Sequence, residues 1–172
     1  PTTSSAASDV YKRQGQVQEL ELRLQGDFAS HPSQPLVIAS LKGLLGAVLG
    51  DSINFVNASL EAKARGIRVL EVKDEASRDY AGGSLQLISR GDQGSRSVTG
   101  AVFADGELRI TSIDEFPVNV TPSSHMLFTR HRDMPGIIGQ LGSMLGEHNV
   151  NIAAMQVGRK IVRGDAVMVL SI

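Results

Sequence analysis

The residues best suited to chemistry in this chain lie in one segment near its C-terminus. Asp133 stands just ahead of the pair Pro135-Gly136, and apolar residues at helical spacing follow. Backbone N–H groups at the start of a helix favour an anion, and a carboxylate beside them can hold a cation. This arrangement suits a small zwitterion such as a free amino acid. Its ammonium would meet Asp133. Its carboxylate would meet the backbone N–H groups of Gly136, Ile137 and Ile138.

Other roles are open for the polar residues of this segment. Asp133 can instead be a helix N-cap, which is a common role for aspartate, and a cap can also contact a ligand. Pro135 suits the first turn of the helix, because the N–H that proline lacks has no partner within the helix there. Asn151 lies in the next predicted strand and could supply an amide to the same ligand.

The helix predicted over residues 135–148 carries glycines in its interior. A helical wheel places an apolar arc toward the core, made of Ile137, Ile138, Leu141, Met144 and Leu145. Gly139, Gly142 and Gly146 form a second stripe beside this arc. Each glycine costs roughly 0.5–1 kcal/mol relative to alanine, so close approach by another element is expected in compensation. Ordinary packing within the domain and a symmetric contact between subunits are both open.

Several classes of partner and chemistry have no support in the composition. The formal net charge of -1 provides no basic field for nucleic acid. The absence of cysteine excludes disulfides, a thiolate nucleophile and a cysteine-ligated metal, and it fits the cytoplasm. The longest apolar run, residues 36–50, is interrupted by Lys42 and is shorter than the ~20 residues that span a bilayer, so no membrane anchor is predicted. No zinc spacing occurs among the four histidines, His31, His125, His131 and His148, so no metal site is predicted.

The first two thirds of the chain have the pattern of a sheet with covering helices. Residues 1–14 share no periodicity with the residues after them and are interpreted as a disordered tail or a sequence scar. A strand is predicted from residue 16, and a helix from Pro35 to a stop at Gly50. "INFVN" is predicted to be extended, with Asn57 capping a helix that Gly66 ends. A strand over residues 67–75 and three more over residues 84–113 complete an antiparallel meander.

A second domain is predicted to begin near Pro122, where prolines and serines separate the meander from the next helical pattern. Its elements are strands over residues 126–132, 151–160 and 165–172, with the glycine-containing helix after the first of them. No helix or strand follows the third strand, so this domain is predicted to be cut short. The fold class is therefore α+β.

Two parts of the sequence resemble one known protein family. "HRDMPGIIGQLGSMLGEHNVNIAAMQVGR" resembles the start of an ACT domain, a ligand-sensing βαββαβ module of ferredoxin-like fold, and in particular the one that ends D-3-phosphoglycerate dehydrogenase. "VNASLEAKARGIRVLE" and "SVTGAVFADGELRI" resemble the intervening, anion-binding domain that precedes it in that family. The resemblance extends from Gln16 to Ile172 and implies an intervening domain over residues 15–121 and a truncated ACT domain over residues 122–172.

The resemblance implies ligands and the residues that bind them. ACT domains of that family pair between subunits and bind L-serine at the interface, which implies a homo-oligomer. Carried over by position, the serine-binding residues are His131, Asp133 and Asn151, and Gly139 and Gly142 lie against the partner. A phosphate-bearing anion is implied for the intervening domain, with Lys42, Arg90 and Arg96 as its contacts.

The sequence also departs from the family in what it lacks. The nucleotide-binding loop and the His/Arg/Glu set for hydride transfer have no counterpart, and Gly139-Gln-Leu-Gly142 is only half of such a loop. No NAD site and no catalytic residue are therefore predicted in this chain. The resemblance implies a regulatory fragment of an NAD-dependent dehydrogenase of serine biosynthesis. The β-type part of an L-serine dehydratase and a free-standing ACT-type binding module are the alternatives.

Overall fold

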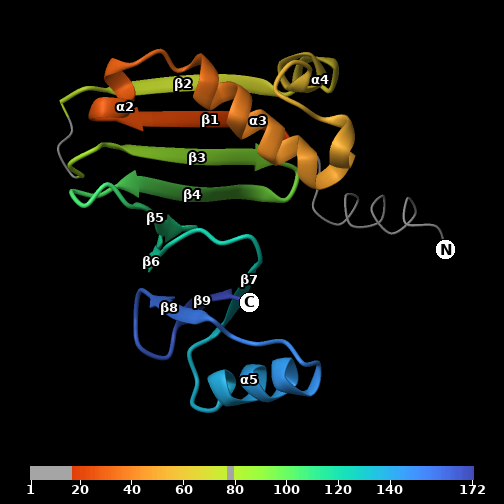
Figure 1. The fold of residues 1–172 in the computed structure, drawn as a ribbon, viewed down its shortest axis with the longest axis vertical. Coiled ribbons are helices and arrows are strands. Elements are labelled where there is room, and N and C mark those ends of the chain that lie inside the picture. The colour runs from red at the N-terminus through yellow and green to blue at the C-terminus, as the bar shows by residue number, and fades with distance from the viewer. Residues whose placement is uncertain (1–16, 77–79) are drawn as a thin grey trace. The chain divides into compact units, whose positions relative to one another are not determined.

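The computed structural model describes residues 17–76 and 80–172, and these divide into two compact units. The N-terminal unit ends at Ser97 and the C-terminal unit begins at Val98 (Figure 1). The predicted α+β class is confirmed, because each unit combines strands with at least one helix. The domain boundary that the sequence predicts near Pro122 stays a prediction. The tail predicted over residues 1–14 lies outside the described residues.

The N-terminal unit is built on β1 (Val17–Gln25), which pairs in parallel with β2 (Arg68–Asp74) and antiparallel with β3 (Ser84–Gly91). Alternate residues of β1 face opposite sides of this sheet. Leu20 and Leu22 are buried in the hydrophobic core, whereas Glu19 and Glu21 lie on the other face. The alternation of apolar and polar residues in the sequence therefore predicted both this strand and the face of it that is buried.

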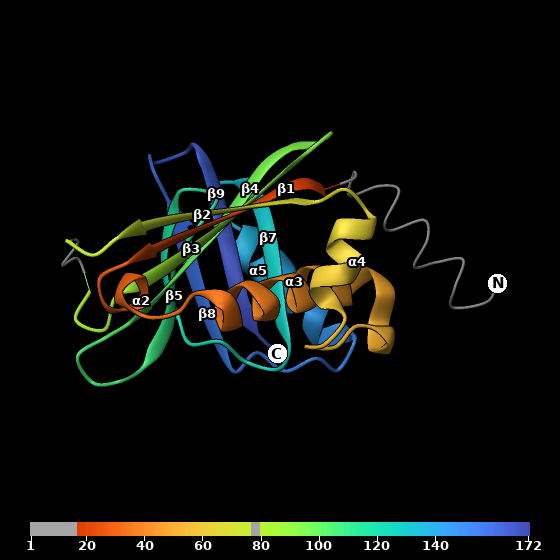
Figure 2. The same ribbon diagram turned by 90° about the horizontal axis from the view of Figure 1, so that it is seen from above.

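Helices cover the apolar face of these strands. They are α2 (Asp27–Ser30), α3 (Gln34–Leu49), the 3-10 turn η1 (Gly50–Ser52) and α4 (Ala58–Ala64). Figure 2 shows α2, α3 and α4 on the same side of β1, β2 and β3. The 19 residues of α3 and η1 together are long and apolar enough to cross a membrane. In this fold Val37, Leu41 and Leu45 of α3 are buried in the core, and 17% of the apolar segment is buried.

The predicted helix ends are confirmed, but the segment between the two helices is not extended. Gly50 and Gly66 both have positive φ where α3 and α4 end. The prediction for "INFVN" is wrong, because residues 55–57 form a turn. Asn57 does occupy the N-cap position of α4, yet its side chain does not cap the helix. The Asn57 side-chain amide instead bonds backbone groups of Ser52 and Asn54. The side chain therefore stabilises the turn and not the start of the helix.

The predicted antiparallel meander is wrong in its first strand, because β2 pairs in parallel with β1 at the edge of the sheet, and the meander has a further strand, β6 (Phe116–Val120), at its end. The meander runs through β3, β4 (Gly94–Val102), β5 (Leu108–Ile113) and β6 in hydrogen-bonded order. The segment that contains β6 was interpreted as a separator because of its prolines. Pro117 is exposed, and the alternating residues Phe116, Val118 and Val120 are buried. A proline is compatible with a strand where its missing N–H is not needed by the ladder.

The C-terminal unit contains a second sheet, of strand order β7-β9-β8. Its elements are β7 (Met126–Arg132), α5 (Ile137–Glu147), β8 (Ala154–Arg159) and β9 (Asp165–Ser171). The central strand β9 is antiparallel to both neighbours, and all five residues from Ala166 to Leu170 are buried. Val167 and Val169 share a core with Phe116, Val118 and Val120 of β6.

Helix α5, which Figure 1 shows beside this sheet, packs less closely than its sequence predicted. No residue of α5 is buried, and Ile138 and Met144 of the predicted core arc are exposed. A Cβ built on any of the three glycines of the stripe, Gly139, Gly142 and Gly146, would meet no atom within 4 Å. Packing within the described chain therefore does not explain these glycines. The alternative, a contact with another subunit, stays a prediction.

Candidate functional site

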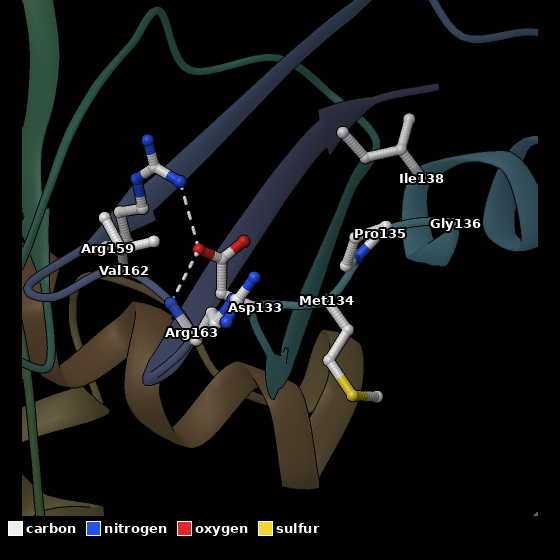
Figure 3. A pocket seen from close by; sticks show the side chains of 8 residues that line it. All are labelled: Asp133, Met134, Pro135, Gly136, Ile138, Arg159, Val162 and Arg163. Atoms are coloured by element: carbon white, nitrogen blue, oxygen red, sulfur yellow. Dashed lines mark hydrogen bonds and ion pairs between the residues drawn. The ribbon is translucent and has the colours of Figure 1, made fainter.

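Asp133 lies in the loop after β7, where two segments of the C-terminal unit meet its carboxylate. Oδ2 accepts a hydrogen bond from the Arg159 guanidinium at 3.0 Å and one from the Arg163 backbone N–H at 3.2 Å (Figure 3). The Asp133 backbone N–H donates to the Gly164 carbonyl at 2.8 Å. The hairpin between β8 and β9 thus fixes both the backbone and the side chain of Asp133.

These residues line a pocket of about 340 Å³ at the start of α5. The lining combines one carboxylate and two guanidinium groups with apolar side chains, and its members are Asp133, Met134, Pro135, Gly136, Ile138, Arg159, Val162 and Arg163. The volume falls within the usual range for small-molecule sites. The pocket therefore offers a charge of each sign close to an apolar wall.

The interpretation of Asp133 as a helix cap is wrong. The N-cap position of α5 is Gly136, with φ of 92°, and no side chain caps the helix. Figure 3 shows the Asp133 carboxylate directed at Arg159 and Arg163 and not at Gly136. Pro135 precedes the helix and does not occupy its first turn, because the left-handed backbone at Gly136 delays the helix until Ile137. The guanidinium of Arg159 attracts the carboxylate more strongly than neutral N–H groups do.

Only some of the other predicted ligand residues lie at the pocket. Gly136 and Ile138 line the pocket, whereas Ile137 does not. His131 lies on β7 opposite Ala166, and its Nδ1 is buried without a hydrogen-bond partner among the described residues. Asn151 is exposed and belongs to the loop before β8, so its prediction as part of a strand is wrong. Neither His131 nor Asn151 lines the pocket.

The hydrogen-bond partners of Asp133 favour the ionised form of its carboxyl group. The hydrogen bond from the Arg163 backbone and then that from Arg159 hold the pKa of this carboxyl below its usual value, with a smaller contribution from His131. Asp133 is therefore ionised at neutral pH. An ammonium group can approach this carboxylate, while the guanidinium groups of Arg159 and Arg163 can receive a carboxylate.

Arg159 and Arg163 were not predicted from the sequence. Arg159 is 26 residues from Asp133, and nothing in its local pattern distinguishes it from a solvated surface charge. The hairpin between β8 and β9 brings it to the pocket. The sequence does show a cluster of basic residues over 159–163, where the predicted strand 151–160 ends.

The three predicted anion contacts lie on three different elements, α3, β3 and β4. Lys42 lies on α3, with its ammonium 4.5 Å from the centre of the Phe55 ring. Arg90 lies on the opposite face of the sheet, where its guanidinium bonds Glu19 at 2.5 Å and Glu21 at 2.6 Å. Arg96 is exposed on β4. Arg90 is thus already neutralised by two acids whose residues are almost fully buried.

The Arg90 cluster predicts how acid affects the N-terminal unit. Hydrogen bonds from Arg90 and Arg68 lower the pKa of Glu19, and those from Arg23 and Arg90 lower the pKa of Glu21. A lowered pKa contributes stability above the ordinary glutamate pKa, and this stability is lost as the pH falls through the lowered value. We expect Arg90→Gln to move acid unfolding, followed by circular dichroism, to higher pH. Arg109→Gln, which removes an exposed pair with Asp105, is the control and should move it little. Equal shifts would contradict this role of Arg90.

Within the described residues, no group of three or more His, Asp or Glu side chains is placed so that it could hold a metal ion. Two adjacent acids, Asp114 and Glu115, lie in the hairpin between β5 and β6. Both have positive φ, and Glu115 pairs with Lys160. The pocket at Asp133 is therefore the best candidate for a functional site.

Comparisons with known proteins identify two families along the chain. The family of the D-3-phosphoglycerate dehydrogenase intervening domain matches residues 11–114, and the ACT domain family matches residues 125–172. A D-3-phosphoglycerate dehydrogenase of Synechocystis sp. is 60% identical over 159 residues, which are 92% of this chain and 28% of that protein. Those of Methanocaldococcus jannaschii and Bacillus subtilis are 35% and 34% identical, over 92% and 90% of this chain. The chain spans 28% to 30% of the length of these relatives.

Proposed function

This chain belongs to the family of the D-3-phosphoglycerate dehydrogenase intervening domain and carries an ACT domain behind it, and from this premise we propose that it is the regulatory, L-serine-binding part of a D-3-phosphoglycerate dehydrogenase. The catalytic domains and their NAD site would belong to the rest of that enzyme, which acts in serine biosynthesis in the cytoplasm. The relatives from Synechocystis, Methanocaldococcus and Bacillus all bear the dehydrogenase name, which favours this proposal over an L-serine dehydratase or a free-standing module.

The observation that carries the proposal is the pairing of opposite charges in the pocket. Asp133 would receive the ammonium group of serine. The guanidinium of Arg159 or Arg163, together with the start of α5, would receive its carboxylate.

We further propose that a second copy of the chain completes the site. Three apolar side chains at the pocket are exposed, Met134 by 53%, Ile138 by 50% and Val162 by 70%. An apolar rim of this kind favours burial against a partner. Asn151 does not line the pocket of its own chain, so its amide would reach the ligand in the pocket of the partner. Serine would then favour the paired arrangement and shift the population of subunit arrangements toward it.

Calorimetric titration of the chain tests the ligand. We expect L-serine to bind, and D-serine and glycine to bind more weakly, because only L-serine can satisfy a chiral site through both charged groups and its hydroxyl. Asp133→Ala should reduce the affinity at least tenfold, which corresponds to about 1.4 kcal/mol. Asp165→Ala is the matched control, since Asp165 pairs with Arg130 and does not line the pocket. Absence of heat with every amino acid would refute amino-acid sensing, and binding that survives Asp133→Ala with Asn151→Ala would place the site elsewhere.

A mixture of two variants tests whether the site is shared. By itself, neither Asp133→Ala nor Asn151→Ala is expected to bind serine with the original affinity. After the two variants are unfolded and refolded together, mixed dimers should contain one intact site, formed by Asp133 of one chain and Asn151 of the other. Titration should then recover about a quarter of the original stoichiometry, as random mixing gives. No recovery on mixing would show that both residues act within one chain.

A further inference from the structure

The outer edge of β2 is an unpaired strand edge in the N-terminal unit, separate from the pocket at Asp133. β2 is the last strand in the order β2-β1-β3-β4-β5-β6, and no strand of the described residues pairs with its outer side. Its ladder with β1 is regular from Arg68 to Asp74, without a bulge, and six of its seven residues are exposed. Such an edge presents backbone donors and acceptors that can pair with another strand.

The hydrogen-bond direction of β2 shows which residues face outward. The Gly26 N–H donates to the Asp74 carbonyl at 3.0 Å, so the backbone of Asp74 is directed at β1. Backbone groups alternate in direction along a strand, and Val69, Glu71 and Lys73 therefore present their N–H and C=O groups to the outside. When two such edges pair antiparallel, a residue whose backbone groups point away from β1 lies opposite another residue of the same kind.

We propose that two copies of this chain pair through β2, antiparallel, about a twofold axis at Glu71. In this register Arg68 of one copy lies opposite Asp74 of the other, twice by symmetry. Leu70 likewise lies opposite Val72, and these side chains are exposed by 39% and 48%. All four residues lie on the sheet face that bears Glu19, because Arg68 pairs with Glu19 across the β1–β2 ladder. Opposite charges and apolar pairs thus match on this face of the strand.

The groups needed for the new ion pairs have remaining hydrogen-bonding capacity. Arg68 uses Nε and Nη2 for Glu19, and a guanidinium has five N–H donors. Asp74 accepts the Ala76 backbone N–H through Oδ1. A carboxylate has about four acceptor positions, so it can also accept a guanidinium. The unfavourable element is Glu71 opposite its own copy, which limits the affinity.

The resulting contact is small and is expected to be weak by itself. Seven residues on each side bury far less than the roughly 1,600 Å² of a standard interface. A second contact elsewhere in the same assembly would make the edge pairing effectively intramolecular and strengthen it. The inference does not depend on the proposed function, because it concerns only the sheet of the N-terminal unit.

Disulfide trapping tests the register in the full 172-residue chain, which contains no native cysteine. Glu71→Cys places two thiols directly opposite each other, about 5.5 Å apart at their Cα atoms, within disulfide range. We expect it to form a covalent dimer roughly tenfold faster than Leu60→Cys, an exposed position on α4 that reports random collision, because pairing raises the effective thiol concentration. Val72→Cys should crosslink slowly, since residue 72 faces residue 70. Equal rates for Glu71→Cys and Leu60→Cys, or faster trapping of Val72→Cys, would overturn the proposal.

A proline at an outward position provides the second test. Lys73→Pro in the Glu71→Cys background removes an N–H that faces away from β1, so pairing with β1 is retained while pairing with another edge is blocked. Lys73→Thr is its matched control, because both substitutions remove the bond from the Lys73 ammonium to the His31 carbonyl. We expect trapping to be lost with proline and kept with threonine, at unchanged far-ultraviolet circular dichroism. Trapping that persists with proline would overturn the proposal.

Discussion

Replacing Gly158 by alanine is expected to lower the free energy of unfolding of the C-terminal unit by about 1–3 kcal/mol, as overpacking of a core does. Gly158 is the buried residue of β8 that contacts the neighbouring strand β6. A Cβ at this position would come within 3.0 Å of the Pro117 carbonyl oxygen, and it would also lie 3.0 Å from Val118 and 3.2 Å from Val167. Backbone and buried valines cannot move aside cheaply, so the strands must separate.

Urea unfolding measures this loss, and Gly100→Ala provides the matched control. Gly100 also lies in a strand of the C-terminal unit, but a Cβ there would meet the Arg109 carbonyl oxygen only at 3.8 Å, an ordinary contact. Alanine at position 100 should therefore change the free energy of unfolding much less. If alanine were equally well tolerated at position 158, the close approach of β8 to β6 would be wrong.

The double substitution Gly139→Ala with Gly142→Ala is expected to have opposite effects on folding and on assembly. Nothing lies within 4 Å of a Cβ at either position, so alanine should stabilise α5 in the dissociated chain by about 1–2 kcal/mol in total. If this stripe lies against another subunit, as the family resemblance implies, the added methyl groups would hold the chains apart. Self-association and serine binding should then be lost together.

Sedimentation at increasing protein concentration, with urea unfolding at low concentration, separates these two effects. Gly43→Ala with Gly46→Ala on α3 is the control, because a Cβ at these positions also meets nothing within 4 Å. It should stabilise the N-terminal unit by a similar amount and leave association unchanged. Association that survives alanine at 139 and 142 would remove the glycine stripe from the subunit contact.

Local patterns predicted most elements of the N-terminal unit. The alternation in β1 and the helical spacing in α3 each predicted an element and its buried face, because a strand and a helix repeat with different periods. Gly50 and Gly66 predicted two helix ends through their conformational freedom. The turn at residues 55–57 was missed because two asparagine side chains bond the backbone there, and residue type alone does not distinguish such a turn from a helix cap.

The sequence by itself determined the fold class, the order of most elements and the segment around Asp133, since each depends on neighbours within one turn of helix or one strand. Only the tertiary structure decided what Asp133 contacts. Arg159 and Arg163 reach it through a hairpin some 26 to 30 residues further along the chain. The strength of a charged contact depends on the distance between the two groups in space. That distance is set only when strands β7, β8 and β9 pair. The same reason applies to β6 and Gly158, whose close contact no local pattern indicates.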